Sequence, residues 1–376
     1  MADSNAEFQL FPVLKERINR YFEESGKNRK ADTALQVKVA IVSIIPVVGY
    51  LFLLLYGGSS IYAAAAGYLV YTIGAALFVV NVAHDASHQA FSTKRTVNRL
   101  LSFSWNIVGI SKYLWEIKHH HSHHIYTNIP YEDVDIAESP LLRFSPAYPY
   151  KNYYKYQYLY AIPLYGLFGI FIVFVKDFVL LFTEHGKSQA AKSLPPFFLA
   201  RLIWTKLVYF TISFIIPYTV LPYAWWQVLI IFLFSLAIAG ALMLLVLVVP
   251  HINEKATLPE NSVFVKNRNE WVLHQIHCTV DSSPESKPLG WLSGGLNTHL
   301  IHHLFPNICH THYVDLSRIV KQTLQEKGIE YHQKTFTTAV IDHFKYLRVL
   351  GRPAAIVIQQ FASMYWMLDF IREGNL

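Results

Sequence analysis

The sequence predicts an all-α integral membrane protein, in which four transmembrane helices form two hairpins and a cytosolic helical cap carries a His-rich site for two metal ions. Three observations support this fold class: the apolar composition, the placement of the basic residues and the clustering of the histidines. Of the 376 residues, 53% are hydrophobic and 15% are charged, whereas soluble proteins carry about 25% charged residues. The composition therefore indicates a membrane protein with sizeable water-exposed parts.

Four apolar stretches have the roughly 20 residues that a helix needs to cross a bilayer. They cover residues 35–56, 61–82, 202–222 and 225–249, and they form two pairs with short connections. A fifth apolar stretch, residues 158–182, contains Lys176 and Asp177. If it crossed the membrane, its two flanks would lie on opposite faces, so we interpret it as interfacial.

The two short connections contain no Lys or Arg, so the basic residues flank the spans on one side only. By the positive-inside rule, both termini and the segment between the hairpins face the cytoplasm in a multi-pass membrane protein. The His-rich site then faces the cytoplasm as well. With this distribution, the net charge of +7 fits an anionic lipid surface and not a nucleic acid. Two cysteines are too few for a disulfide framework, which fits a reducing environment.

The spans divide the chain into three parts. Residues 1–34 are a polar, amphipathic and cytosolic segment without the apolar core of a signal peptide. Residues 35–313 form the membrane domain, and residues 314–376 form a cytosolic helical region. No motif in this last region points to a chemical role.

Histidines gather in three clusters, here called boxes, just outside the spans. The first box is His84 and His88, the second is "HHHSHH" at residues 119–124, and the third is His299, His302 and His303. The spacings i, i+4 and i, i+3, i+4 place such rings on one face of a helix. In the second box, His123 and His124 belong to either possible pattern. His119 and His120 are the alternatives for the remaining ligand, and His121 lies on a different face.

Eight or more imidazoles exceed the needs of one tetrahedral zinc ion, so the boxes predict two metal ions. Imidazole suits zinc, copper, iron and nickel alike. A ligating histidine usually donates its other ring N–H to a nearby acceptor. The candidates for this supporting role are Asp85, Asp133, Asp135 and Asn297. His274 is a possible additional ligand, either direct or through a water molecule.

The remaining histidines carry weaker signals. His251 ends the fourth span on the side of the boxes, which leaves both metal binding and a simple interfacial position open. We expect structural roles for the others, because a lone histidine is more often a surface or satisfied core residue than a ligand. They are His185, His310, His312, His332 and His343.

The motifs "HDASH", "WEIKHHHSHHIYTN" and "GGLNTHLIHHLFPN" resemble the three histidine boxes of the integral-membrane fatty acid desaturases, most closely the acyl-CoA and front-end branch. The resemblance covers roughly residues 70–313. It implies a non-haem centre of two iron ions, O2 as the oxidant, and a double bond inserted into a fatty acyl chain carried by CoA or by a lipid. It also aligns His119, and not His120, with the first histidine of the family's second box.

The chain departs from this branch in two respects. The His-Pro-Gly-Gly haem motif of a fused cytochrome b5 domain is not in the sequence, so the resemblance implies a separate electron donor of the ferredoxin or cytochrome b5 type. The third box begins with His299 where front-end members often have Gln. The position of the double bond therefore stays open.

Two alternative functions remain at this point. The same metal chemistry serves hydroxylases, and desaturases of sphingoid, sterol, carotenoid or alkane substrates. A divalent-metal transporter is the alternative from a different class. Transporters place ionisable ligands within their spans, whereas the interiors of the four predicted spans contain neither His nor an acidic residue. This difference favours an enzyme.

Overall fold

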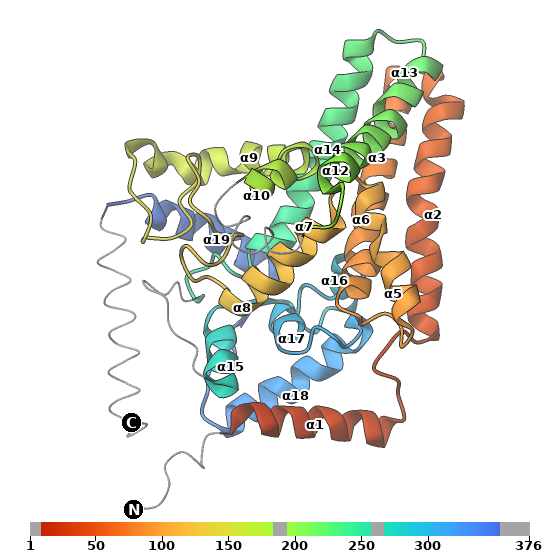
Figure 1. Ribbon diagram of the computed structural model, residues 1–376. Coiled ribbons are helices and arrows are strands. Elements are labelled where there is room, and N and C mark those ends of the chain that lie inside the picture. The colour runs from red at the N-terminus through yellow and green to blue at the C-terminus, as the bar shows by residue number, and fades with distance from the viewer. Residues whose placement is uncertain (1–8, 183–193, 257–266, 354–376) are drawn as a thin grey trace, which may run out of the picture.

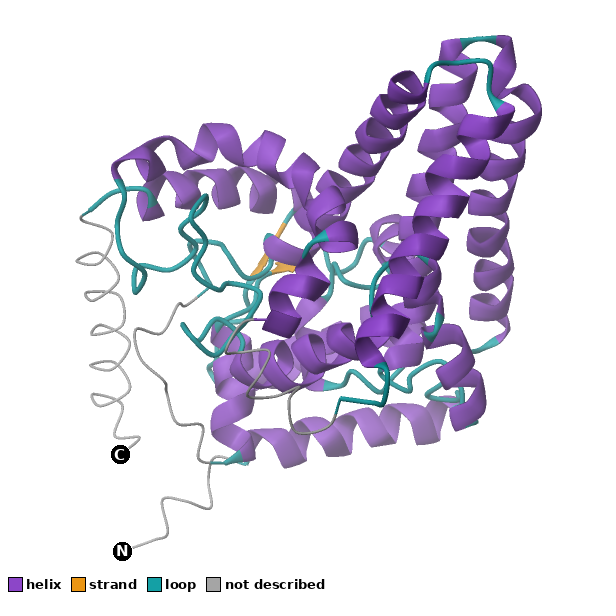
Figure 2. Cartoon of the chain, turned by 45° about the horizontal axis from the view of Figure 1, so that its top comes forward, coloured by secondary structure: helices purple, strands orange, loops and turns teal. Residues whose placement is uncertain are grey.

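The computed structural model describes residues 9–182, 194–256 and 267–353. This part of the chain is mostly helical, and its strands β1 (Asp281–Ser282) and β2 (Gln333–Lys334) form one short parallel pair (Figure 2). The prediction of a helical chain with apolar helices long enough for a membrane is therefore confirmed. His185 and residues 354–376 of the predicted C-terminal region lie outside the described residues.

Five helices of the described part are long and apolar enough to cross a membrane. They are α2 (Thr33–Tyr56); α3 (Ile61–Phe78) with η2 (Val79–Ala83) and α4 (His84–Ser87); η4 (Asn152–Tyr156) with α9 (Gln157–Phe174); α12 (Phe198–Phe210) with η5 (Thr211–Ile215) and α13 (Ile216–Val220); and α14 (Trp225–Val248). Four of them coincide with the predicted spans. The additional candidate is α9, for which the sequence predicts an interfacial position. In Figure 1, α9 runs across the molecule, whereas α2, α3 and α14 rise along it.

Side-chain caps begin both helices of the first hairpin. The Asp32 carboxylate accepts the backbone N–H of Leu35 at 2.8 Å and begins α2. The Ser60 hydroxyl accepts the backbone N–H of Ala63 at 3.1 Å and begins α3. Caps of this kind each contribute about 1 kcal/mol to helix stability. Between α2 and α3, the single turn η1 (Gly57–Ser59) reverses the chain.

The outer face of α2 is a continuous apolar surface. Its exposed side chains are Val37, Ile41, Ile44, Val47, Leu51 and Leu55. A soluble protein rarely exposes an apolar patch of this extent. A helix satisfies its own backbone hydrogen bonds, so it can place such a face in lipid hydrocarbon without further cost. The apolar helices therefore indicate a membrane protein.

A second layer of helices lies across one end of the apolar helices (Figure 1). It contains α1 (Leu10–Ser25), α15 (Arg268–His277), α17 (His299–Leu304) and α18 (Tyr313–Glu326). The amphipathic N-terminal segment forms α1, whose Leu10, Leu14 and Ile18 repeat at every fourth residue and share one core with α15, α17 and α18. This core holds α17, which carries the third box.

The described part of the chain contains further helical elements. They are α5 (Arg95–Ser102), α6 (Ser104–Ile107), α7 (Lys112–Glu116), η3 (Ile117–His123), α8 (His124–Tyr126), α10 (Lys176–Phe182), α16 (Lys287–Ser293), η6 (His310–His312) and α19 (Phe336–Leu350). A buried ion pair fixes α10 to α12. Lys206 donates to the carboxylate of Asp177, which also accepts the backbone N–H of Ser111 at 2.8 Å. Removing one partner of such a pair costs about 3–5 kcal/mol.

Two glycines allow α9 and α14 to cross in backbone contact. A Cβ atom on Gly169 would lie 2.3 Å from the carbonyl oxygen of Leu236, and one on Gly240 would lie 2.3 Å from the backbone nitrogen of Gly169. Tyr165, also on α9, hydrogen-bonds His343 of α19. The helix α9 is therefore in contact with both α14 and α19. The crossing places α9 against the cavity described below.

Replacing Gly169 by Leu should destabilise the protein by about 1–3 kcal/mol or more, because backbone atoms cannot move aside for the new side chain. Gly166→Ala is the matched control on the same helix, since its Cβ would meet Ala237 at an ordinary 3.7 Å. Thermal unfolding of the detergent-solubilised protein measures both. Equal midpoints for the Gly169→Leu variant and the unmodified protein would contradict the close crossing.

Candidate metal centre

The three boxes meet at one buried place between the apolar helices and the second layer. The first box begins on α4, the second lies on η3 and α8, and the third lies on α17. Together with His251, which follows α14, they form two groups in which the candidate ligand nitrogens lie within 4.8 Å of one another. The first group is His84, His88, His119 and His302, and the second group is His123, His251, His299 and His303.

His124 lies against the first group. Its Nε2 atom is 3.1 Å from Nε2 of His119 and 3.0 Å from Nε2 of His302, and Nε2 of His119 is 3.3 Å from Nε2 of His84. A ring nitrogen either donates or accepts, so these three contacts cannot all be good hydrogen bonds. Two imidazole nitrogens that bind one ion at about 2.1 Å, at an angle of roughly 90–110°, lie roughly 3.0–3.4 Å apart. These three spacings thus suit His84, His119, His124 and His302 as ligands of one ion.

In the second group, contacts to the outer nitrogens fix the tautomers. The Nδ1–H of His251 donates to the carbonyl of Cys278 at 3.2 Å, that of His299 donates to the carbonyl of Leu296 at 3.1 Å, and Nδ1 of His123 lies 3.1 Å from the carboxylate of Asp133. A carbonyl oxygen can only accept, so the proton is on Nδ1 and the lone pair of Nε2 is free. The Nε2 atoms of His251 and His303 are buried and have no hydrogen-bond partner among the described residues. A metal ion would satisfy them.

Burial keeps most of these imidazoles neutral. It lowers the pKa of His251 to about 3, and it lowers the pKa values of His124 and His302 well below their ordinary value, where neighbouring imidazoles add to the effect. His123 differs. Burial is the largest single effect and lowers its pKa, but the charge and hydrogen bond of Asp133, together with the charge of Asp135, outweigh it and the net shift is upward. The cluster is therefore mainly a set of neutral imidazoles, the form that binds metal ions.

The π-helical backbone of η3 determines which rings of the second box converge. In a π-helix, residues i and i+5 are hydrogen-bonded neighbours, so His119 and His124 can lie side by side, with their Nε2 atoms 3.1 Å apart, whereas His123 belongs to the second group. His119 is buried and belongs to the first group. His120 lies beside that group with its Nε2 atom unpaired among the described residues, and His121 is exposed.

Of two further candidate histidines, one belongs to a group and the other does not. His251, which the sequence leaves open, belongs to the second group. The signal for it is its position directly after an apolar span, on the side of the boxes. His274 belongs to neither group, and its Nε2–H donates to the carbonyl of Thr127 at 2.8 Å.

Two of the four candidate supporting groups lie beside the second group. Asp133 contacts His123 directly and also accepts the backbone N–H of Asn128 at 2.9 Å. Asp135 lies farther away, at 3.8 Å from His123, and forms an ion pair with Lys118 at 2.7 Å. The nearer carboxylate therefore orients the ring, and the second one is shared with a cation.

The other two supporting candidates form no hydrogen bond with a box histidine in the described part of the chain. Asp85 accepts the Nδ1–H of His310 at 2.7 Å, and the other ring nitrogen of His310 contacts Lys38 at 2.8 Å. Asn297 donates to the carbonyl of Ser283 at 3.0 Å. Both side chains thus tie the segments around the boxes together and do not orient a box ring directly.

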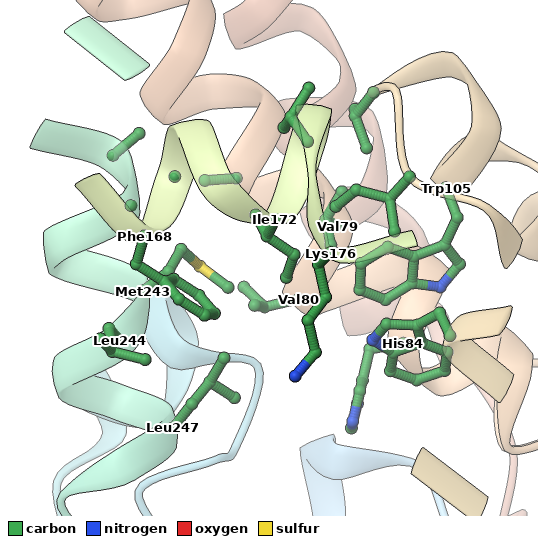
Figure 3. Close-up of a pocket in the computed structure, with 18 of the residues that line it drawn as sticks. Val79, Val80, His84, Trp105, Phe168, Ile172, Lys176, Met243, Leu244 and Leu247 are labelled. Carbon is green, nitrogen blue, oxygen red and sulfur yellow. The ribbon is translucent and has the colours of Figure 1, made fainter. Parts of the chain in front are cut away.

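An apolar cavity of ≈ 200 Å³ lies between α3, α9 and α14 and reaches the histidines (Figure 3). Its walls are mainly aliphatic and aromatic, and they include Val79, Val80, Trp105, Phe168, Ile172, Met243, Leu244 and Leu247. The histidines that line it are His84, His119, His123, His251 and His299. Ligand sites are typically apolar cavities with a few convergent polar groups. An apolar space that ends on imidazoles able to hold a metal ion suits a long apolar substrate.

Comparison with known proteins agrees with this geometry. A family model described as "Fatty acid desaturase" matches residues 59–335, which include all three boxes and four of the five candidate spans. The chain is 32% identical to the sn-1 linoleoyl-lipid 6-desaturase of Synechocystis sp. (strain ATCC 27184 / PCC 6803 / Kazusa), over 90% of this chain and 95% of that protein. It is 29% identical to the acyl-lipid (8-3)-desaturase of Physcomitrium patens, over 92% of this chain and 72% of that protein. It is also 29% identical to the probable Delta(5) fatty acid desaturase C of Dictyostelium discoideum, over 91% and 76% respectively.

Proposed function

Because the chain belongs to the fatty acid desaturase family and is thereby an oxidoreductase that desaturates fatty acyl chains, we propose that it binds the acyl chain in the cavity of Figure 3 and desaturates it beside two iron ions. The observation that carries this proposal is the contact between the apolar cavity and both histidine groups. Membership of this family sets aside the alternative of a divalent-metal transporter.

We assign the two irons to nine histidines. The first ion would be held by His84, His88, His119, His124 and His302, and the second by His123, His251, His299 and His303. Bound iron would supply the activation of O2 that the removal of hydrogen from an unactivated methylene requires. Imidazole alone does not select iron, so the choice of metal rests on the family. His120 and His274 are left out of this ligand set.

The chain's own residues orient the ligands and enclose the substrate. Trp115 stacks on His119 with ring centroids 4.5 Å apart and on Trp105 at 4.3 Å, which forms an aromatic wall beside the first group. Asp133 holds the Nδ1 proton of His123, so that Nε2 faces the second ion. Ile172 lines the cavity from α9 and keeps water from the acyl chain.

We propose that the substrate is the acyl chain of a membrane lipid and that the double bond enters near its carboxyl end. The names of the relatives support this choice, since they include a linoleoyl-lipid 6-desaturase, an acyl-lipid desaturase and a Delta(5) desaturase. The cavity also lies between helices with apolar outer faces, so a lipid chain can enter it from the bilayer. A CoA thioester would have to enter from water.

Electron balance requires a reductant. Reduction of O2 to two waters takes four electrons, of which the new double bond supplies two. We propose that a separate protein of the ferredoxin or cytochrome b5 type supplies the other two, together with protons from water. In this proposal the non-haem iron lies in the buried histidine cluster, between the apolar helices and the second layer. Because the apolar helices face lipid, the donor would dock on the surface of the second layer.

For the membrane topology, we propose four spans in two hairpins, with α9 along the interface and the second layer in the cytoplasm. The contact between His124 and His302 supports an even number of crossings between the second and third boxes. Two crossings, α12–α13 and α14, keep both boxes on one side, whereas a third crossing by α9 would separate them. The apolar connections without Lys or Arg support the orientation.

Expression of the chain in a host of known lipid composition, with a ferredoxin or cytochrome b5 system present, should produce at least one new unsaturated fatty acid. Gas chromatography with mass spectrometry identifies the product and its double-bond position. His124→Ala should abolish the product, because it removes an imidazole that contacts two others. Hydroxylated chains in place of a new double bond would favour the related hydroxylase chemistry.

The ligand assignment predicts different results for neighbouring histidines. His119→Ala should lower the iron content and abolish activity, because it removes a buried member of the first group. His121→Ala should retain both, because this ring is exposed, and His120→Ala should retain the iron. Metal analysis of the purified variants measures the iron content of each. Iron loss in His120→Ala with retention in His119→Ala would reverse the assignment.

Impermeant maleimide labelling in sealed vesicles should separate two sets of single cysteines. Ser59→Cys and Ala224→Cys, in the connections, should react from one side; Lys155→Cys and Leu194→Cys, before and after α9, should both react from the other. The two native cysteines are buried and should stay unlabelled. Reaction of positions 155 and 194 from opposite sides would show that α9 crosses the membrane.

A further inference from the structure

Lys176 places an amine inside the apolar cavity. It is the first residue of α10 and directly follows Val175, the residue after the end of α9. Figure 3 shows its side chain extending into the cavity between Ile172, Val80 and the ring of His84. The walls around it are mainly hydrocarbon, so an amine here carries an unfavourable desolvation free energy unless it has hydrogen-bond partners.

The surrounding residues do not provide those partners. Within the described part of the chain, the acceptor for Lys176 is the carbonyl of Val134 at 3.5 Å, the outer limit of a hydrogen bond. An amine has at least two N–H groups, and the ammonium form has three. Lys206, the neighbouring buried lysine, shows the contrast, because its Nζ contacts the carbonyls of Gly109 and Val173 and the carboxylate of Asp177.

The nearby carboxylates already have partners. Asp177, next in sequence to Lys176, is bound by Lys206 and by the backbone N–H of Ser111. Asp135 is bound by Lys118. Lys176 itself forms no ion pair with any described carboxylate. Apart from the long contact to Val134, its N–H groups have no acceptor in the described part of the chain, so at least one can bind a ligand in the cavity.

An acyl chain gives such a site something to bind. Its methylenes are alike, so an apolar wall alone does not fix how far the chain slides along the cavity. The polar groups of a ligand site fix orientation and specificity, and the acyl carbonyl oxygen is the hydrogen-bond acceptor that every ester or thioester substrate carries. A fixed carbonyl would set the distance, counted in methylenes, from the carboxyl end to the metal ions.

We propose that Lys176 donates a hydrogen bond to the carbonyl oxygen of the bound acyl group and thereby determines which carbon–carbon bond lies beside the two ions. This inference rests on the proposed function, since it takes the cavity as the acyl site. It assigns Lys176 a role in binding and in the position of the double bond, and no role in metal binding. A neutral amine and an ammonium group can both donate this bond.

The test compares ligands that differ only at the carbonyl. One pair is a lysophospholipid with a long acyl ester and its ether analogue with the same chain; the other is the matching acyl-CoA and its S-alkyl thioether. Radioligand binding to the purified iron-loaded protein, without reductant, gives the four dissociation constants. The carbonyl ligand of one or both pairs should bind about 10- to 100-fold more tightly, the range for a hydrogen bond to a charged group.

Variants then test whether Lys176 causes the tighter binding of the carbonyl ligands. Lys176→Met, of similar length but without a donor, should bind the ester and the ether equally, and Lys176→Arg should restore most of the preference. Lys155→Met is the matched control, because this exposed lysine lies outside the cavity, and it should behave as the unmodified protein. In the expression host, Lys176→Met should spread the double bond over several positions.

Each outcome decides. A preference in the lipid pair alone points to a lipid ester, and one in the CoA pair alone points to a thioester. No carbonyl preference in either pair, or a preference that persists in Lys176→Met, overturns the inference. If Lys176→Met does not fold, retention by Lys176→Arg supports the inference and loss overturns it. A preference without any desaturated product would instead reject the proposed function and leave the lysine contact standing.

Discussion

The convergence of uncharged imidazole nitrogens on two points is the constraint on which the rest of the structure depends. A buried nitrogen without a partner is costly, and the histidine cluster holds several of them in the described part of the chain, including Nε2 of His88, His251 and His303. Contacts to the outer nitrogens fix several of the rings, including those of His123, His251 and His299. Metal ions at these points would convert the unpaired nitrogens into the strongest contacts of the molecule.

The two layers of helices position different histidines of the cluster. The apolar helices bring the first box and His251 to one level, because α3 with its continuation and α14 both end there. The second layer supplies α17, held by a core that includes Leu300, Ile301 and Leu304. The acceptors for the outer nitrogens come from yet other segments, such as the carbonyl of Cys278 after α15. Fold and site are thus one network of contacts.

The sequence predicts the apolar helices and the three boxes because these signals are local. A span needs only a run of apolar residues, and a helical ligand pair needs only a spacing. The choice between His119 and His120 is harder, because an ideal α-helix favours His120 and the π-helix η3 turns His119 inward. A π-helical turn depends on what surrounds it, and one sequence does not reveal it.

Contacts between distant segments lie further beyond the sequence. Asp133 is the carboxylate that orients His123, yet the sequence gives it no advantage over Asp135. The choice depends on the turn between them and the second box, where Asn128 has φ +60° and Tyr131 has φ +68°. Asn tolerates this left-handed region and Tyr rarely enters it. Asp85 and Asn297 show the reverse case, since they are close in sequence to ligands but bind other partners.

The neighbouring charges Lys176 and Asp177 show how one sequence feature can have two structural meanings. In the sequence they interrupt an apolar run and favour an interfacial helix. In the structure the helix axis breaks at Val175, where φ is −120°, and adjacent residues on a helix point in different directions. Asp177 turns toward Lys206 and fixes α10, while Lys176 turns into the cavity. The ion pair that stabilises the fold thus engages the Asp177 carboxylate, whereas Lys176 forms no ion pair with a described carboxylate and remains a polar donor in a mainly apolar wall.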